Sequence, residues 1–357
     1  MLGDATPARF SDVVRTVAED PALDALIVIC APTFAAPPDA VVAAIEDAAA
    51  AAARRIPVIA VVLAERPAGA APTGIPVVAF PEDAARAVGH AADYAAWRRA
   101  PHEPALHPSD LDPDAAAAVL AEALGSGREW LSGEELGRLA EAYGLPRTPA
   151  RVVAGPEEAV AVAAELGGPV AVKGLSATLV HKTDSGAVRY GLAGAGEVRG
   201  GARDVCDAVT AAGHHLDGLL VQRMSPPGTE LLIGVTQDPA LGAVVACAAG
   251  GVTAELIDDV AVRLAPLETG DADEMLRSLR LFPVLAGYRG APGADLRAVA
   301  DVLQRLAAMA AAHPEIREVD ANPVLAHPDG AVIVDLWVRI APAVRRPSAP
   351  SMQQSTR

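Results

Sequence analysis

Aromatic and basic side chains are both scarce in this chain. Only 3% of its 357 residues are aromatic, so the 52% hydrophobic content comes largely from alanine and valine, and it is too high for a disordered chain. This length suggests two or three globular domains. Lys and Arg total 29 against 45 Asp and Glu, which leaves a net charge of −16. That charge disfavours binding to phosphate backbones and to anionic lipid, so neither nucleic acid nor a membrane is expected as a partner.

Cysteines and long apolar segments are few as well. The three cysteines are odd in number, lie far apart and sit in apolar runs, which predicts reduced thiols in a cytoplasmic protein. They are Cys30, Cys206 and Cys247. The uncharged stretch at residues 241–254 is too short to span a bilayer, and the N-terminus has no basic segment followed by an apolar one.

The first hundred residues alternate between apolar strands and helices. Strands are expected at 22–30, 56–63 and 75–80, and helices at 7–19, 39–54 and 81–99. Apolar strands separated by helices pair in parallel with both faces covered. Residues 1–100 are therefore predicted to form a small α/β domain.

The pattern changes after a proline-rich stretch. Residues 101–128 are typical of a linker that carries one docking helix, and residues 129–345 predict an α+β body of short strands with helices packed on one side. The polar end, residues 346–357, is expected to be a disordered tail.

Lysine is the rarest basic residue, and both copies fall in one segment. Of the 29 basic side chains, 27 are arginine and two are lysine, Lys173 and Lys182. Lys173 ends the apolar run PVAVK, where a nucleotide phosphate is a natural counter-ion for its ammonium group. The alternative is a chance lysine on a surface loop, and for Lys182 the two interpretations are balanced.

His181 lies between the two lysines, in LVHKTDSGAVRYGL. An imidazole at a glycine-containing turn with hydroxyl and amide donors nearby suits transfer of a phosphoryl group onto nitrogen. Most single loop histidines are simply solvated, so this local sequence leaves both interpretations open.

A terminal hairpin collects three oxygen-bearing side chains. Pro328-Asp329-Gly330 predicts a turn between two apolar runs, and a turn centred on Pro328 and Asp329 places Asn322 opposite Asp335. Asp320 shares their face because strand side chains alternate. Such a set suits Mg²⁺, which takes one or two protein oxygens and completes its shell with water and nucleotide phosphates. The alternative is a solvated polar face.

The segment 219–238 predicts a strand, a proline-glycine turn and a second strand. The backbone from Gln222 to Met224 could offer N–H and C=O groups to an adenine edge, and Glu230 a polar contact to the nucleotide. Core packing is the ordinary role for Met224.

Several spaced motifs together resemble a known family. They are PVAVKGLSATLVHKTDSGAVRYGL, LVQRMSPPGTELLIGVTQDPALGAVV, AGGVTAELIDDVAVRLAPL, GYRGAP and EIREVDANPVL. In this order they resemble the ATP-grasp part of the ADP-forming (NDP-forming) acyl-CoA synthetases, relatives of succinyl-CoA synthetase. Residues 1–100 resemble the flavodoxin-like domain that precedes it in fused members. The resemblance covers about residues 2–343.

The resemblance implies the reaction acyl-CoA + phosphate + ADP ⇌ acid + CoA + ATP, through an acyl phosphate and phosphohistidines. Lys173 matches the nucleotide-phosphate lysine, and His181 matches the phosphohistidine that passes phosphate to ADP. Asp320 matches the acidic residue that supports this histidine, while Asn322 and Asp335 match the Mg²⁺ ligands. The implied cofactors are ATP or ADP and Mg²⁺.

The chain also departs from that family. Alanine stands at Ala187 and Ala248 where the family has glycine, which is tolerable only if φ is negative there. Nothing matches the CoA-binding Rossmann domain or the domain with the first active-site histidine. The chain is thus expected to be a fragment, a natural remnant or a subunit. Its expected partner is a CoA-binding domain or subunit, or further copies of the chain in a homo-oligomer. The alternative to an enzyme component is a non-catalytic nucleotide-binding regulatory module, or the synthetase-like part of a protein acetyltransferase.

Overall fold

The computed structural model describes residues 5–31, 37–63, 74–99, 104–105, 108–176, 186–251 and 258–343. The chain divides into two compact units, unit 1 (Met1–His102) and unit 2 (Glu103–Arg357). The expected tail at 346–357 lies outside the described residues. Among the helices that are described, none is both long and apolar enough to cross a membrane.

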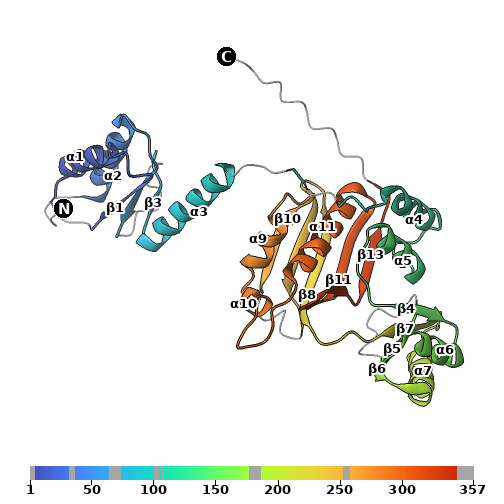
Figure 1. Cartoon of the computed structure of the whole chain (residues 1–357). Helices are drawn as coiled ribbons and strands as arrows, with labels where there is room; N and C mark the ends of the chain where they lie inside the picture. The colour runs from blue at the N-terminus through green and yellow to red at the C-terminus, as the bar shows by residue number, and fades with distance from the viewer. Residues whose placement is uncertain are drawn as a thin grey trace. The chain divides into compact units, whose positions relative to one another are not determined.

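Unit 1 is a three-stranded parallel sheet with helices (Figure 1). Its strands lie in the order β1-β2-β3, and β2 is buried along its whole length because both faces of the sheet are covered. The predicted α/β arrangement is confirmed. The elements are α1 (Pro7–Ala18), β1 (Leu26–Cys30), α2 (Pro38–Ala51), β2 (Val58–Val62), β3 (Val77–Val78) and α3 (Pro81–Arg99).

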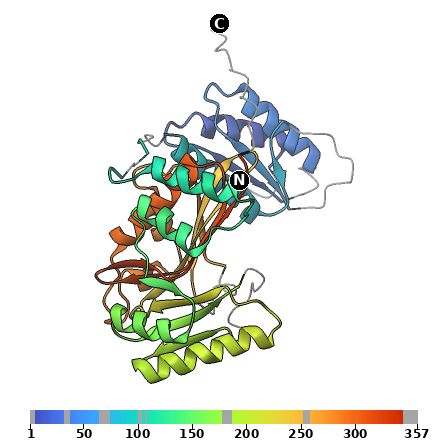
Figure 2. The same ribbon diagram turned by 90° about the vertical axis from the view of Figure 1, so that its right-hand side faces the viewer.

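Unit 2 contains two lobes, each with its own antiparallel sheet. The small lobe has the strand order β4-β7-β5-β6, and α6 and α7 pack together on its sheet (Figures 1 and 2). Its elements are β4 (Ala150–Val153), α6 (Pro156–Leu166), β5 (Val170–Leu175), β6 (Val188–Leu192), α7 (Gly194–Ala211) and β7 (Gly218–Arg223).

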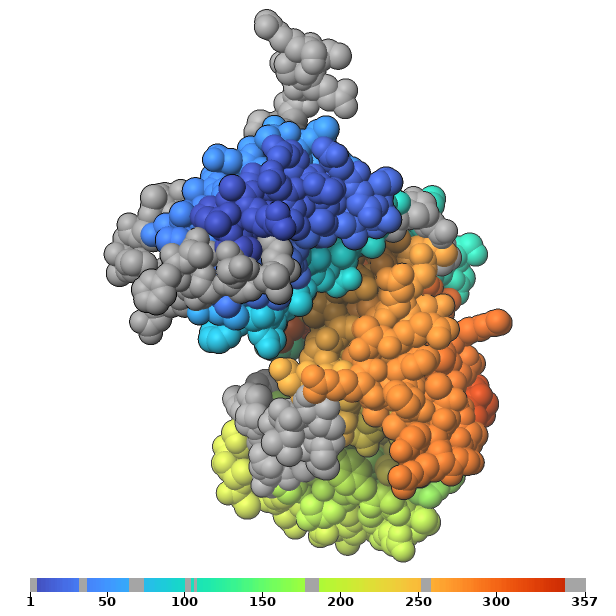
Figure 3. Space-filling model, turned by 90° about the vertical axis from the view of Figure 1, so that its left-hand side faces the viewer, coloured from blue at the N-terminus to red at the C-terminus, as the bar shows by residue number. Residues whose placement is uncertain are grey.

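The large lobe has the strand order β10-β9-β8-β11-β12, and β13 pairs with β11 as well. Figure 3 shows the large lobe mainly in orange and the small lobe in yellow-green. The strands are β8 (Thr229–Asp238), β9 (Gly242–Ala249), β10 (Val260–Leu264), β11 (Ile316–His327), β12 (Gly330–Ile333) and β13 (Leu336–Ile340). The helices are α4 (Pro113–Gly125), α5 (Gly133–Ala142), α9 (Asp271–Ser278), α10 (Phe282–Leu285) and α11 (Leu296–Ala312).

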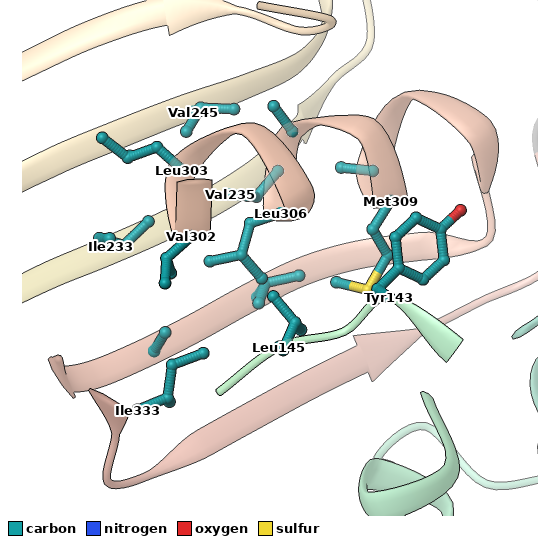
Figure 4. Close-up of a cluster of buried hydrophobic side chains, with 14 of the residues drawn as sticks. Tyr143, Leu145, Ile233, Val235, Val245, Val302, Leu303, Leu306, Met309 and Ile333 are labelled. Atoms are coloured by element: carbon teal, nitrogen blue, oxygen red, sulfur yellow. The ribbon is translucent and has the colours of Figure 1, made fainter. Parts of the chain in front are cut away.

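The largest hydrophobic core of the molecule lies where α11 packs on the large-lobe sheet (Figure 4). Leu303 and Leu306 of α11 are fully buried with Ile233 and Val245 of the sheet. This packing makes the large-lobe sheet rigid, because a close-packed interior does not deform continuously. The candidate site residues lie on the strands and turns of this sheet and in the small lobe.

Candidate functional site

Lys173 is a buried cation that joins the two lobes. It lies within β5, a strand buried over five of its six residues, and only 7% of its side chain is exposed. Its Nζ donates to Oδ1 of Asp335 at 2.6 Å. Asp335 belongs to the large lobe, in the two-residue turn between β12 and β13. The rare lysine and one of the predicted metal ligands therefore meet at one place.

The terminal hairpin has the predicted register. Ala326 pairs with Ala331 and Val324 with Ile333 about a turn at Pro328 and Asp329. Beyond the end of β12, the Asn322 N–H donates to the carbonyl of Asp335 at 3.0 Å, so these two residues do lie opposite one another.

Asp320 lies two residues before Asn322 and pairs with Trp337 of β13. Burial raises the pKa of its carboxyl above the usual range, and the nearby charges of Glu318 and Asp335 raise it further. Asp320 and Asp335 thus act on one another electrostatically. A cation placed between them would relieve this repulsion.

Gln222 is buried, with 4% of the residue exposed, and its side-chain Nε2 makes two hydrogen bonds. Nε2 donates to Oγ1 of Thr148 and, at 2.7 Å, to the carbonyl of Val334. The next two residues are also engaged through their backbone: the Arg223 N–H donates to Pro149 and the Met224 N–H to Pro169, both at 2.9 Å. These two N–H groups are therefore already bonded and do not face a base as free donors.

A cavity of about 490 Å³ adjoins this segment. Met224 lines it, and 36% of Met224 is exposed, so Met224 is not a core residue. The cavity is bounded by both lobes, since Pro169 comes from the small lobe and Val332 from β12. An apolar pocket of this size with a few polar groups at its edge is typical of a small-molecule site.

Glu230 lies at the start of β8, opposite Leu325, and is exposed. It packs against a glycine pair: the Gly250 N–H donates to the Glu230 carbonyl at 2.9 Å, and a Cβ on Gly250 would come within 2.8 Å of the Glu230 backbone. Gly251 has φ 83°, a left-handed conformation that favours glycine. Both glycines are therefore required by local geometry.

Alanine is accommodated at the two positions where the resembled family has glycine. Ala187 and Ala248 are not among the described non-glycine residues with positive φ, whereas Gly186, beside Ala187, has φ 69°. The extra methyl groups thus sit where L residues are unstrained. His181 and Lys182 lie outside the described residues, and their roles remain predictions.

Two residues of this site were absent from the sequence-based candidates. Thr148 is buried and accepts a hydrogen bond from Gln222. Burial lowers the pKa of the Arg147 guanidinium, and the nearby charge of Asp335 offsets part of this decrease. The isolated bridge between Arg147 and Ile333 brings both residues to the β12–β13 turn. No sequence pattern marks this segment, because the contact is made across 186 positions of the chain.

The oxygen donors fit a hard divalent cation. Asn322 could supply an amide oxygen and Asp335 a carboxylate, which suit Mg²⁺ because that ion keeps several water or phosphate ligands. Across the described ranges there is no group of three or more His, Cys, Asp and Glu side chains that could hold a metal ion. The set thus suits a metal shared with phosphates better than a closed protein cage.

A family model for the ATP-grasp domain matches residues 122–340. The beta subunit of acetate–CoA ligase [ADP-forming] I of Pyrococcus furiosus is 35% identical over 195 residues, which cover 54% of this chain and 84% of that subunit. Acetate–CoA ligase [ADP-forming] I of Archaeoglobus fulgidus is 31% identical over 344 residues, which cover 94% of this chain and 48% of the relative. The chain thus spans about half of that relative.

A solved structure supports the same relationship. The dinucleotide-forming acetyl-coenzyme A synthetase 1 of Ca. Korarchaeum cryptofilum, solved with coenzyme A and Mg-AMPPCP, matches with a TM-score of 0.57 and 36% identity. The match covers 63% of this chain and all of the matched chain. The chain belongs to the ATP-grasp family, as a relative of the beta subunits of ADP-forming acetate–CoA ligases.

Proposed function

We propose that the chain is the nucleotide-binding, phosphohistidine-transferring part of an ADP-forming acyl-CoA ligase, which interconverts acyl-CoA + ADP + phosphate and acid + CoA + ATP. One observation carries the proposal: the buried ammonium of Lys173 meets the Asp335 carboxylate opposite Asn322, at the junction of two lobes. A cation for phosphate and oxygen ligands for Mg²⁺ are needed side by side in a Mg-nucleotide site.

The described residues take distinct roles in this proposal. Lys173 leaves Asp335 and binds the nucleotide phosphates, and Asp335 and Asn322 hold Mg²⁺. When bound, Mg²⁺ neutralises charge on the phosphates and orients them. The cavity beside Met224 receives the base, while Glu230 supplies a polar contact from β8.

His181 is the proposed phosphoryl acceptor. In the direction of ATP use, an imidazole nitrogen attacks the γ-phosphorus, so an N–P bond forms while the bond from this phosphorus to the ADP oxygen breaks. The reverse step makes ATP. Asp320, whose carboxyl faces the charge of Asp335, is proposed to support this histidine. The support for His181 is the HKTD motif and the presence of a phosphohistidine segment in the matched Korarchaeum protein.

The acyl and CoA chemistry is assigned to a partner. The matched relatives include beta subunits and a ligase about twice as long, so we propose a CoA-binding subunit or domain in addition to this chain. We also propose a cytoplasmic location, because Cys30, Cys206 and Cys247 are free thiols.

Calorimetric titration of the purified chain with ATP tests the nucleotide site. We expect binding in Mg²⁺ that weakens at least tenfold in EDTA and at least tenfold in Asp335→Asn with Mg²⁺ present. Equal affinity in Mg²⁺ and EDTA would contradict the metal assignment. Binding without any transfer of phosphate to His181 when the CoA-binding partner is present would favour the regulatory module.

A further inference from the structure

Three buried polar residues converge on one short turn. The Thr148 N–H donates to the Ile333 carbonyl at 3.1 Å, Nε2 of Gln222 to the Val334 carbonyl at 2.7 Å, and Nζ of Lys173 to the Asp335 carboxylate at 2.6 Å. Thr148, Gln222 and Lys173 are each no more than 6% exposed. The last residue of β12 and both residues of the turn are thus held by three separate side-chain or backbone donors.

The turn at Val334 and Asp335 needs such support. It separates β12, which ends at Ile333, from β13, which begins at Leu336. Toward β11 it keeps two bonds: Val334 N–H donates to Pro323, and the Asp335 carbonyl accepts from Asn322, both at 3.0 Å. The Val334 carbonyl is bonded on the small-lobe side, to Gln222.

Gln222 is well placed to act as a fixed anchor. It lies in β7, which pairs with β4 on one side and β5 on the other, so its backbone is set by two ladders. Its amide also contacts Thr148. Lys173 cannot anchor the turn in the same way, because in the proposed function its ammonium moves to the nucleotide phosphates.

The geometry points to Gln222 as a positioning residue: through the Val334 carbonyl it holds the turn that presents the Asp335 carboxylate to the metal. This inference rests on the proposed function and assigns to the Gln222 side chain a task other than contact with the nucleotide. Partners that orient a metal ligand change metal affinity by about 10- to 100-fold when they are removed.

Two variants separate this task from simple packing. Gln222→Leu removes both amide bonds and puts an apolar side chain of comparable volume in the same place, which leaves the Val334 carbonyl without its partner. Thr148→Val removes only the hydroxyl that contacts Gln222 and keeps the Gln222 bond to Val334. Circular dichroism and thermal melts establish that both variants are folded.

Hydrogen exchange of the nucleotide-free chain tests the anchor itself. We expect the peptide that covers residues 332–337 to exchange at least tenfold faster in Gln222→Leu than in the wild type, and within twofold of wild type in Thr148→Val. Equal exchange in the wild type and Gln222→Leu would overturn the inference, whatever the metal measurements show.

Mn²⁺ titration, followed by electron paramagnetic resonance in the presence of AMPPCP, tests the consequence for the metal. We expect Gln222→Leu to weaken Mn²⁺ binding at least tenfold while the affinity for AMPPCP in EDTA stays within twofold of wild type. A matching loss of AMPPCP affinity in EDTA would instead make Gln222 a direct nucleotide contact and overturn the inference. If the wild type binds no AMPPCP at all, the proposed function fails, and the exchange result alone then decides whether Gln222 anchors the turn.

Discussion

The two units differ in what they bury. The core of unit 1 is apolar throughout its described residues, whereas the six buried polar or charged residues found in the described chain all lie in unit 2. They are Glu135, Thr148, Lys173, Gln222, Asp259 and His313. Burying a polar group costs free energy unless it is paired, so the partners of these six groups show what each one does.

These buried groups serve two different purposes. Asp259 accepts from the backbone N–H groups of Arg280 and Leu281, and Glu135 caps α5 through Ser132, so these carboxylates stabilise the fold. Thr148, Lys173 and Gln222 instead meet at the β12–β13 turn, where the proposed metal ligand Asp335 lies. The comparison thus separates a unit whose described core is apolar from one that buries polar groups around the proposed site.

Loss of the buried cation should have the largest effect. Lys173→Met should lower phosphorylation of the chain by Mg-ATP by about 10²- to 10³-fold, because one preorganised charge facing the phosphates is removed. Arg151→Met, in strand β4 of the same sheet where Arg151 is exposed, is the matched control and should stay within twofold of wild type. Rapid-quench measurement with γ-labelled ATP gives both rates, and a wild-type rate for Lys173→Met would contradict the assignment.

A cavity in unit 1 should affect stability and leave the site intact. Ile45 of α2 is fully buried, so Ile45→Ala should lower the free energy of unfolding of unit 1 by about 3 kcal/mol. Nucleotide affinity should be unchanged, since the proposed site belongs to unit 2. Urea denaturation and calorimetric titration of the same sample check both statements, and a large loss of ATP affinity would show that the units do not divide the tasks in this way.

The buried pair of Tyr143 and His313 should make unit 2 sensitive to acid. Tyr143 Oη and His313 Nε2 lie 2.9 Å apart, and burial lowers the pKa of His313 and raises that of Tyr143 to about 12. Because the unfolded chain binds the His313 proton more tightly, stability is expected to fall as the pH drops below about 6.5.

Tyr143→Phe removes the hydrogen bond and should cost about 1–2 kcal/mol at pH 8. In His313→Leu the decrease of stability between pH 7 and pH 5 should become smaller. Thermal melts over this pH range measure the effect, and an unchanged slope in His313→Leu would show that another group titrates there.

The smallest effect expected is a gain in stability. Burial and the charges of Glu318 and Asp335 raise the pKa of Asp320, so its ionised form destabilises the folded state above that pKa. Asp320→Asn should therefore raise the melting temperature at pH 7, by less as the pH falls, and should lower phosphorylation. A lower melting temperature at pH 7 would mean that the carboxylate makes a stabilising contact in the folded state.

Local features of the sequence were sufficient for much of this site. The Pro328-Asp329 turn sets the hairpin register by counting alone, and this places Asn322 opposite Asp335. The scarcity of lysine drew attention to Lys173. Its burial in the structure is unusual for a lysine. In unit 1, continuous apolar strands between helices were sufficient to predict a parallel sheet.

The remaining features depend on contacts between distant segments. The sequence suggested backbone contacts from Gln222 to the nucleotide, and it gave no sign that the side-chain amide of Gln222 bonds Val334, 112 positions away. The pairing of Lys173 with Asp335 spans 162 positions. Helix α7 was not predicted from the sequence either. Its helical signal is weakened by four glycines, Gly194, Gly196, Gly200 and Gly201. Val198 and Val205 are buried only because the helix packs on the sheet.

Incubation of the purified chain with γ-labelled ATP and Mg²⁺, followed by mass spectrometry, tests the central claim most directly. The account predicts acid-labile, base-stable phosphate on His181, present in the wild type and lost in His181→Ala, which should still bind Mg-ATP. Phosphate on His181→Ala at the wild-type level would contradict it, as would failure of the wild type to bind Mg-ATP.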